Sequence, residues 1–266
     1  MKKFLKLSLM KALKISNMYP TWMTDKNDLM SFIKKLYPSS TNKELIRLGP
    51  KGDGGYLIPN DLNGIKACFS PGVSFESGFE KDCAELGMNV FLADKSVEGP
   101  ASEHNLFCFT KKFVGAISND EFMTLDDWVN SSTLETSSDL LIQIDIQGYE
   151  YEVFLSTSEC LMKRFRIIVV EFHQLDQLWN RPFFYLVSRS IEKVLKTHTC
   201  VHIHPNNCCG SINFNGLQIP RVMEFTFLRN DRIESSSYQK IFPNQLDHDN
   251  TNNPTLVLPN CWYCNE

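Results

Sequence analysis

The sequence predicts an α/β fold in which a doubly wound, mainly parallel sheet ends in an antiparallel edge strand. Strand-like apolar runs alternate with amphipathic helical patterns through most of the chain. Several of these runs are apolar throughout, which is typical of parallel strands that are buried on both faces. The last run, residues 222–229 (VMEFTFLR), alternates in period two and follows another strand-like run, so we expect an antiparallel strand pair at the edge.

The composition is that of one large globular domain with extensions. The chain has 266 residues, of which 42% are hydrophobic, and it can therefore bury a full core without disulfides or metals. The net charge of -4 provides no basic field, so we expect no nucleic-acid partner. The nine cysteines are an odd and scattered set, which favours free thiols in a reducing compartment and hence a cytoplasmic protein.

Residues 1–44 are interpreted as an N-terminal helical extension. Lysines interrupt every apolar run of residues 1–16, so this stretch cannot span a membrane and lacks the continuous core of a signal peptide. Leu5, Leu9, Ala12 and Leu13 share one helical face. We favour a helix that packs on the domain over weak contact with a membrane surface. A second amphipathic helix is expected over residues 25–36.

Residues 45–59 (LIRLGPKGDGGYLIP) are unusually rich in glycine. Four glycines and Asp53 lie close to Tyr56, so the backbone must turn sharply or approach another group closely. Two interpretations follow: a hairpin with a Gly-Gly turn, or a loop that covers a ligand and contacts it through Asp53 and Tyr56.

The first strand, turn and helix of a nucleotide-binding sheet are expected next. Residues 65–70 form a short buried strand, Pro71 and Gly72 begin the turn, and residues 75–86 follow in helical pattern. The next strand, residues 89–93, ends in Asp94. A carboxylate at the tip of the second strand, about 20 residues after a glycine turn, is placed to bind two ribose hydroxyls.

The remaining elements follow the same alternation. Strands are expected over residues 105–110, 112–117, 140–144, 165–170 and 199–204, and a helix over 181–196. Thr124 is a natural N-cap, and Asp126 and Asp127 then lie in the positive first turn of a helix, which makes them structural. Residues 231–266 lack periodicity and are interpreted as a C-terminal tail or lid.

Acids follow two later strands, at Asp145 and Glu171, and histidines lie nearby in sequence at His173 and His204. Because the carboxyl ends of parallel strands meet at one edge of a sheet, we expect these side chains to face a shared site. Carboxylates with imidazole and amide groups fit Mg²⁺, Mn²⁺ or Ca²⁺. The alternative is a metal-free polar cluster, in which His173 or His204 is the general base.

Motifs for other chemistries are missing from the sequence. Cys261 and Cys264 form a single C-x-x-C, without the second pair that a structural zinc site needs. The sequence has no GK[ST] phosphate loop and no G-x-S-x-G elbow.

One ordered set of motifs points to a known family. The set comprises DGGYLIP (53–59), FSPGVSFESGFE (69–80), Asp94, TLDDW (124–128), DLLIQIDIQGYEYEVF (139–154), IIVVEFHQL (167–175), VHIHPNN (201–207) and IPRVMEFTFLR (219–229). In this order the set resembles the FkbM family of S-adenosylmethionine-dependent methyltransferases, and residues 45–230 are interpreted as that domain. The chain departs from the family pattern D-[IV]-E-G-x-E at Gln147, where the family has its first glutamate.

The resemblance implies a class I methyltransferase (Rossmann-like) fold and methyl transfer to oxygen, most often to a sugar hydroxyl of a glycan or a glycan precursor. It also implies that the methyl group points toward Asp145 and Glu171, where related sugar methyltransferases use acids to hold Mg²⁺. The resemblance therefore keeps Mg²⁺ or Mn²⁺ at Asp145 and Glu171 as an option beside the metal-free cluster. The expected cofactor contacts are Ser70, Pro71, Gly72, Ser74, Glu76, Asp94, Asp53 and Tyr56.

Three alternatives stay open at this point. A methyltransferase of the same fold could act on a lipid or a secondary metabolite. A nucleotide-sugar-binding enzyme such as an epimerase or dehydrogenase is less well supported, because the first turn lacks G-x-G-x-x-G. A non-catalytic binding module could also keep the fold, and Gln147 is the one hint of it.

Overall fold

The computed structural model describes residues 13, 15, 20–73, 75–132, 135–234 and 237–264. Most of the N-terminal stretch, for which membrane-surface contact was considered, lies outside the described residues, and so does Ser74. Within the described ranges, no helix combines the length and the hydropathy needed to cross a membrane.

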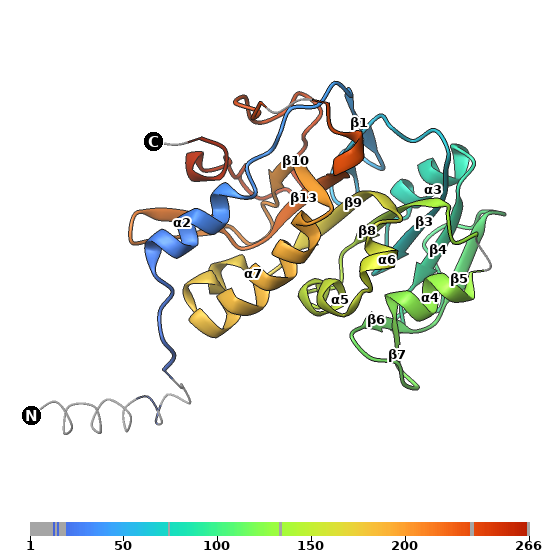
Figure 1. The fold of residues 1–266 in the computed structure, drawn as a ribbon, viewed down its shortest axis with the longest axis horizontal. Coiled ribbons are helices and arrows are strands. Elements are labelled where there is room, and N and C mark those ends of the chain that lie inside the picture. The colour runs from blue at the N-terminus through green and yellow to red at the C-terminus, as the bar shows by residue number, and fades with distance from the viewer. Residues whose placement is uncertain are drawn as a thin grey trace, which may run out of the picture.

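A seven-stranded sheet organises the fold (Figure 1). In spatial order its strands are β10 (His198–Pro205), β13 (Met223–Arg229), β9 (Phe165–Phe172), β8 (Asp139–Ile144), β3 (Ile65–Pro71), β4 (Asn89–Ala93) and β5 (Phe107–Thr110). Neighbours from β9 to β5 pair in parallel, and β13 runs antiparallel to both of its neighbours. The predicted doubly wound, mainly parallel sheet is confirmed.

The expected antiparallel strand pair lies at the edge of the sheet, where β10 is the outermost strand and pairs antiparallel with β13, which lies between β10 and β9. The polar residues of β13 lie on a face that a second layer covers. The hydroxyl of Thr226 donates to the carbonyl of Leu57 at 2.6 Å, and the carboxylate of Glu224 accepts from Asn250 at 2.6 Å. A buried face with satisfied polar groups gives the same period-two pattern as an exposed one.

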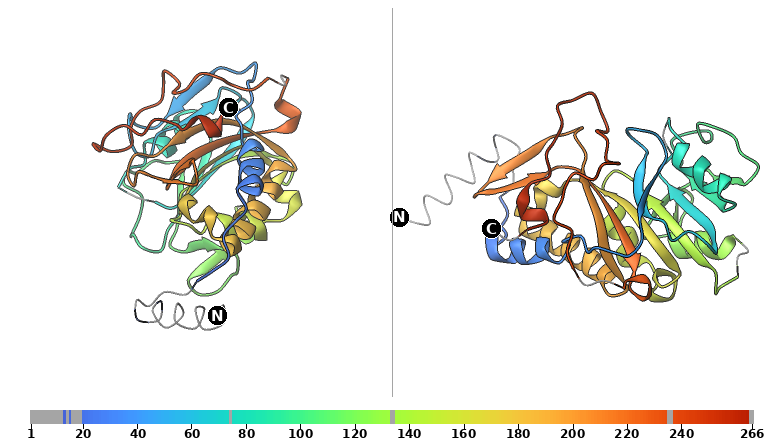
Figure 2. Two further views of the ribbon diagram at one scale, coloured as in Figure 1. Left: turned by 90° about the vertical axis from the view of Figure 1, so that its left-hand side faces the viewer. Right: turned by 90° about the horizontal axis from the view of Figure 1, so that it is seen from above.

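Different elements cover the two faces of the sheet, as Figure 2 shows from two further directions. One face packs against α4 (Leu125–Ser131), α5 (Glu150–Ser156) and α7 (Arg181–Leu195). The other face packs against α3 (Gly78–Glu85) and the antiparallel hairpin of β1 (Leu45–Leu48) and β2 (Tyr56–Pro59). The glycine-rich segment is therefore a hairpin, as one of its two interpretations stated.

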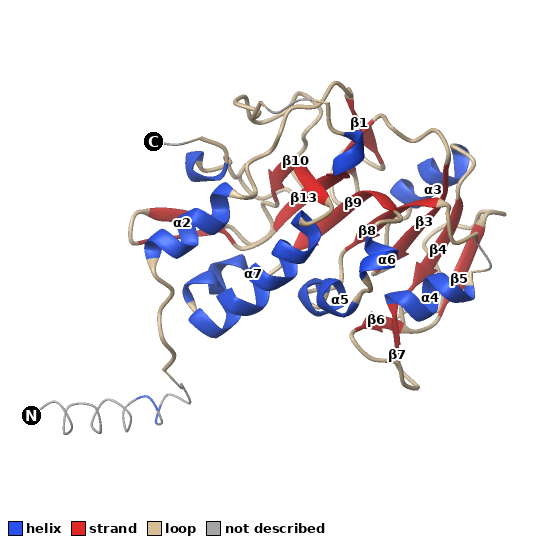
Figure 3. Cartoon of the chain, in the orientation of Figure 1, coloured by secondary structure: helices blue, strands red, loops and turns tan. Residues whose placement is uncertain are grey.

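Short elements complete the chain (Figure 3). They are α2 (Lys26–Lys34), α6 (Glu159–Met162), the parallel pair β6 (Phe113–Gly115) and β7 (Phe122–Thr124), the hairpin β11 (Ser211–Phe214) and β12 (Leu217–Pro220), and the 3₁₀ turns η1 (Leu175–Trp179), η2 (Asn230–Arg232) and η3 (Asn260–Trp262). The hairpin β11–β12 was not predicted from the sequence. Its turn residues Asn215 and Gly216 both have positive φ, and Asn-Gly between two short apolar runs is a strong hairpin signal.

The segment around Tyr37 and Ser39 meets the C-terminal stretch at the β10 end of the sheet. The backbone N–H of Ser39 donates to the carbonyl of Cys200 at 2.8 Å, which covers part of the edge of β10. Tyr37 donates its hydroxyl to the carbonyl of Cys264 at 2.8 Å. Trp262 is fully buried and packs edge-on against Phe225 of β13. The C-terminal stretch thus contributes to the core of the domain.

Substitution of Trp262 by alanine tests this contribution. Because the indole is 0% exposed, we expect Trp262→Ala to lower the free energy of unfolding by about 3–5 kcal/mol. Val257, in the same stretch, is 74% exposed, and Val257→Ala should change the stability by less than about 0.5 kcal/mol. Urea denaturation measures both. Equal effects of the two substitutions would show that the C-terminal stretch does not belong to the core.

Candidate active site

Two turns lie in contact at the carboxyl ends of β3 and β8. Gly72, with φ of 93°, follows β3, and its backbone N–H donates to the carbonyl of Ala93 at 3.0 Å. A Cβ added to Gly72 would lie 1.7 Å from the carbonyl oxygen of Asp145. Only glycine permits this approach, because any side chain here would displace the residue that begins the second turn.

A cavity of about 380 Å³ opens beside these turns. This volume is typical of small-molecule sites. Its walls are mainly apolar, with aromatic rings from the small β6–β7 sheet, and polar groups gather near Asp94 and Asp145. The lining residues are Gly72, Val73, Ala93, Asp94, Ser96, Phe113, Val114, Phe122, Asp145, Ile146, Gln147 and Tyr149. The structure therefore brings together Gly72, Asp94 and Asp145, as the sequence predicted.

The side chain of Asp94 is held in place by the turn after β3 and by the residues that follow β4. Its Oδ2 accepts a hydrogen bond from the N–H of Val73 at 3.1 Å. Its Oδ1 accepts from the N–H and the hydroxyl of Ser96, both at 2.6 Å. Because a carboxylate offers about four lone-pair sites, Oδ2 keeps the capacity to accept another bond from the cavity.

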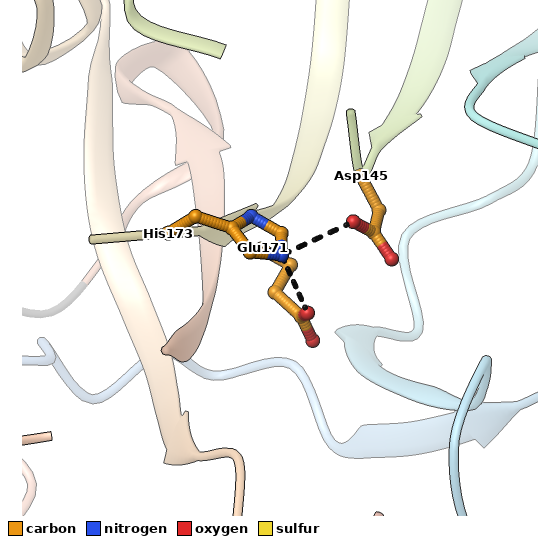
Figure 4. Close-up of side chains that lie close together, drawn as sticks. All are labelled: Asp145, Glu171 and His173. Atoms are coloured by element: carbon orange, nitrogen blue, oxygen red, sulfur yellow. Dashed lines mark ion pairs between the residues drawn. The ribbon is translucent and has the colours of Figure 1, made fainter. Parts of the chain in front are cut away.

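A cluster of two acids and one histidine lies next to the cavity (Figure 4). The Nε2 atom of His173 lies 3.3 Å from Glu171 Oε1 and 3.6 Å from Asp145 Oδ1. One ligand atom from each of the three residues lies within 4.8 Å of the other two. The amide of Asn206 donates to Glu171 Oε2 at 3.0 Å. The three residues, predicted from two strand ends, thus form one cluster, and Asp145 also lines the cavity.

Glu150, which sequence analysis did not assign to the site, fixes the orientation of His173. Its Oε1 atom lies 3.1 Å from His173 Nδ1 and accepts from the backbone N–H groups of Ile146 and Gly148 at 3.0 and 3.1 Å. Glu150 is completely buried. Its contact directs Nε2 of the imidazole toward Asp145 and Glu171. A glutamate at the first residue of a helix, just after a glycine turn, was the available signal.

Negative charge exceeds positive charge in this cluster. Burial raises the pKa of Asp145 well above its usual value, and the charge of Glu171 raises it further. Burial alone would lower the pKa of His173, but hydrogen bonds to Glu150 and Glu171 raise it to about 10. Within the described residues, Asp145 Oδ1 is a buried atom without a hydrogen-bond partner. Three carboxyl groups around one imidazole favour an additional cation.

Several residues predicted to bind the cofactor take part in other contacts. The hydroxyl of Ser70 lies 2.7 Å from Gln143 Oε1, and Gln143 donates to the hydroxyl of Tyr56 at 3.1 Å, which forms a buried polar network. Glu76 accepts from the N–H of Gly78 at 2.7 Å at the start of α3. Ser70, Tyr56 and Glu76 are not among the residues that line the cavity, and their contact with a cofactor stays a prediction.

The other predicted residues lie around the cluster. Pro71 accepts from the N–H of Asp145 at 3.4 Å. Burial raises the pKa of Asp53, as does the charge of Glu171, which indicates that Asp53 faces the Glu171 side of the site. His204 does not join the cluster; its Nδ1 lies 3.7 Å from Asp247 Oδ2. Gln147 has φ of 58° and lines the cavity.

Alanine at Gly72 tests the contact between the two turns, with Gly87 as a matched control. Both glycines have positive φ, but a Cβ at Gly87 would meet nothing within 4 Å. Gly87→Ala should therefore cost only the left-handed backbone penalty of about 1–2 kcal/mol. Gly72→Ala should cost about 2 kcal/mol more, because the carbonyl of Asp145 must also move. Urea denaturation compares the two, and equal costs would contradict the contact.

Comparison with known proteins supports the interpretation of the motifs. Residues 80–197 match the family model described as Methyltransferase FkbM domain. No curated protein matches the chain. Among solved structures, the chain is similar to the crystal structure of a mutant of the 16S rRNA (adenine(1408)-N(1))-methyltransferase from Catenulisporales acidiphilia, with 7% sequence identity, a TM-score of 0.29, and coverage of 72% of this chain and 100% of that chain.

The family match confirms the resemblance that the ordered motifs suggested. It begins inside α3 and ends just after α7, and it therefore includes β4, β8, β9 and the acid–histidine cluster. The seven-stranded, mainly parallel sheet fits the class I methyltransferase fold that the resemblance implied. The chain contains a methyltransferase FkbM domain at residues 80–197.

Proposed function

We propose that this protein transfers the methyl group of S-adenosylmethionine to a hydroxyl oxygen of a sugar, in a glycan or a glycan precursor. One observation carries the proposal: Asp145 lines the cavity and also belongs to the acid–histidine cluster. A cofactor in the cavity and an acceptor at Glu171 would meet at this residue. The sugar acceptor rests on the resemblance to the FkbM family and on the polar character of the Glu171 side.

The residues that line the cavity fit S-adenosylmethionine. The absence of a side chain at Gly72 leaves its backbone open to close approach. Asp94 offers a carboxylate that can accept from both hydroxyls of a ribose. Phe113 and Phe122, whose ring centroids lie 5.4 Å apart, provide an apolar surface for the adenine ring. We assign the ribose to Asp94 and the sulfonium end to the Asp145 side.

The cluster also fits a divalent cation. The donors would be Asp145 Oδ1, Glu171 Oε1 and His173 Nε2, and Glu150 would hold the other ring nitrogen of His173. Carboxylate oxygens suit Mg²⁺ and Mn²⁺, and the imidazole favours Mn²⁺ of the two. A histidine ligand whose second nitrogen donates to a carboxylate is a common arrangement at metal sites. When bound, the cation would lower the pKa of an acceptor hydroxyl.

The side chains of the cluster would align the acceptor and remove its proton. When bound, S-adenosylmethionine supplies a methyl group on a positively charged sulfur, which the acceptor oxygen displaces in line. Asp145 and Glu171 lie where a carboxylate can take the proton from the hydroxyl. The raised pKa of Asp145 makes its ionised form a stronger base. Without a bound metal, His173, whose pKa is raised to about 10, keeps its proton near neutral pH and serves better as an orienting cation than as the base; a bound cation would replace the proton on Nε2.

Methyl transfer to a lipid or a secondary metabolite is the second candidate, and the same cavity would serve it. The lysine-rich residues 1–16 are the specific feature that favours a membrane-borne acceptor. The cytoplasmic compartment expected from the cysteine pattern remains part of the proposal.

Binding of S-adenosylmethionine tests the proposed function directly. Isothermal titration calorimetry should detect binding to the wild-type protein. Asp94→Ala should weaken it about 100-fold, because it removes the charged partner of two hydroxyls (roughly 3 kcal/mol). Asp145→Ala should keep the affinity within about threefold and abolish methyl transfer. Absence of binding to the wild type would refute the proposal.

Binding of Mn²⁺ to the wild-type protein tests the metal site. Titration followed by electron paramagnetic resonance should detect one tightly bound ion, and Glu171→Gln should weaken its binding by about 10–100-fold. Glu159→Gln is the matched control, because the side chain of Glu159 is 67% exposed and lies outside the cluster. If both substitutions have the same effect, the bound ion is not held by the cluster.

A further inference from the structure

A polar segment of the C-terminal stretch, residues 246–253 (LDHDNTNN), crosses the Glu171 side of the site. We propose that this segment, called here the acceptor segment, forms the wall that binds the methyl acceptor and that it selects a neutral, hydroxyl-rich molecule over an anionic one. The inference rests on the proposed methyl transfer and adds to it the chemical class of the acceptor and the residues that select it.

Asn207 fastens the acceptor segment to the loop that follows β10. Its side-chain amide donates to the carbonyls of Thr251 and Asn253 at 3.1 and 2.8 Å. Its side-chain oxygen accepts from the N–H and the hydroxyl of Thr251 at 2.9 and 3.1 Å. The preceding residue, Asn206, donates to Glu171. Two adjacent asparagines therefore connect the cluster and the acceptor segment within one short loop.

Two further residues of the segment reach the strands beside Glu171. Asp247 accepts from His202 at 2.9 Å, which holds the segment over β10. Asn250 donates to Glu224 at 2.6 Å, and Glu224 is the cross-strand partner of Glu171. The segment thus borders Glu171 on two sides, through Asn206 and through Glu224. It supplies none of the residues that line the cavity beside Asp94, so the cofactor side and the acceptor side use separate parts of the chain.

Polar atoms on this side lack partners. Among the described residues, Asn250 Oδ1 and His204 Nε2 are buried without a hydrogen-bond partner, and His204 as a whole is only 8% exposed. Asp145 Oδ1, which belongs to the cluster, is in the same state. Buried polar atoms are normally satisfied, and hydroxyl groups of a ligand can donate to the two oxygens and accept from the imidazole nitrogen.

The charges on this side disfavour an anionic acceptor. Glu171, Glu224 and Asp247 are carboxylates at or next to the acceptor segment. The nearby guanidinium of Arg47 already donates to the carbonyls of Pro50 and Gly52 at 2.7 and 2.8 Å. In the cation-free cluster, a phosphate or carboxylate on the acceptor would be repelled by Glu171 and Asp247, whereas neutral hydroxyls can donate to them.

Saturation-transfer NMR on the protein saturated with S-adenosylhomocysteine tests the proposal. The probes are the methyl glycosides of glucose, galactose and mannose, with glucose 1-phosphate as the anionic counterpart. We expect saturation to be transferred from the protein to at least one methyl glycoside, and no such transfer to glucose 1-phosphate. Asn207→Ala and Asn250→Ala should each weaken binding of that glycoside by about tenfold or more, while Asn213→Ala, on the exposed part of β11, should not.

Calorimetry with S-adenosylhomocysteine separates the possible failures. Both segment variants should bind it as the wild type does, which also shows that they are folded. Absence of binding to the wild type would refute the proposed methyl transfer itself. Three results would each overturn the assignment of the acceptor segment. The first is stronger binding of glucose 1-phosphate than of any glycoside, the second is no binding of any glycoside, and the third is unchanged glycoside binding by both variants.

Discussion

The contact between the turns after β3 and β8 is the constraint on which the site depends. With no side chain, Gly72 lets its backbone lie against the carbonyl of Asp145. This contact fixes where the chain leaves β8, and therefore where the carboxylate of Asp145 lies between the cavity and the cluster. A larger residue at position 72 would separate the two turns and would alter both the cavity and the cluster at once.

The site also requires that the imidazole of His173 be held in one orientation. One carboxylate oxygen of Glu150 accepts hydrogen bonds from two backbone N–H groups of the turn and contacts one nitrogen of His173. The turn, the start of α5 and the histidine after β9 are thereby held together by a single buried carboxylate. The cost of burying that charge is offset by the three hydrogen bonds. The other imidazole nitrogen then faces Asp145 and Glu171.

The sequence was sufficient to predict the sheet and the acids at its edge. Apolar runs that end in Asp94, Asp145 and Glu171 indicate buried strands, and the acids mark the end of the sheet at which ligands bind. His173 could be predicted because it follows Glu171 by two residues. Each of these signals is local, and the parallel arrangement of the strands converts local signals into a shared site.

The remaining features depend on contacts between distant parts of the chain. The aromatic walls from β6 and β7 reach the cavity only through tertiary packing. Ser70 and Tyr56 belong to predicted binding motifs, yet they pair with Gln143 inside the core, which no local pattern reveals. The layer that covers β13 is of the same kind, because polar residues on a covered face and on an exposed face have the same spacing.

The order of the strands also constrains how the chain can fold during synthesis. β3 lies between β4 and β8 but precedes residue 80, where the family match begins, so a fragment of residues 80–197 would have its sheet divided in the middle. β10 finds its sheet neighbour only when β13 has been made. Pairings of this kind close long loops and slow folding. The ribosome must therefore release most of the chain before the sheet is complete, and until then the edge of β9 stays open to pairing with other chains.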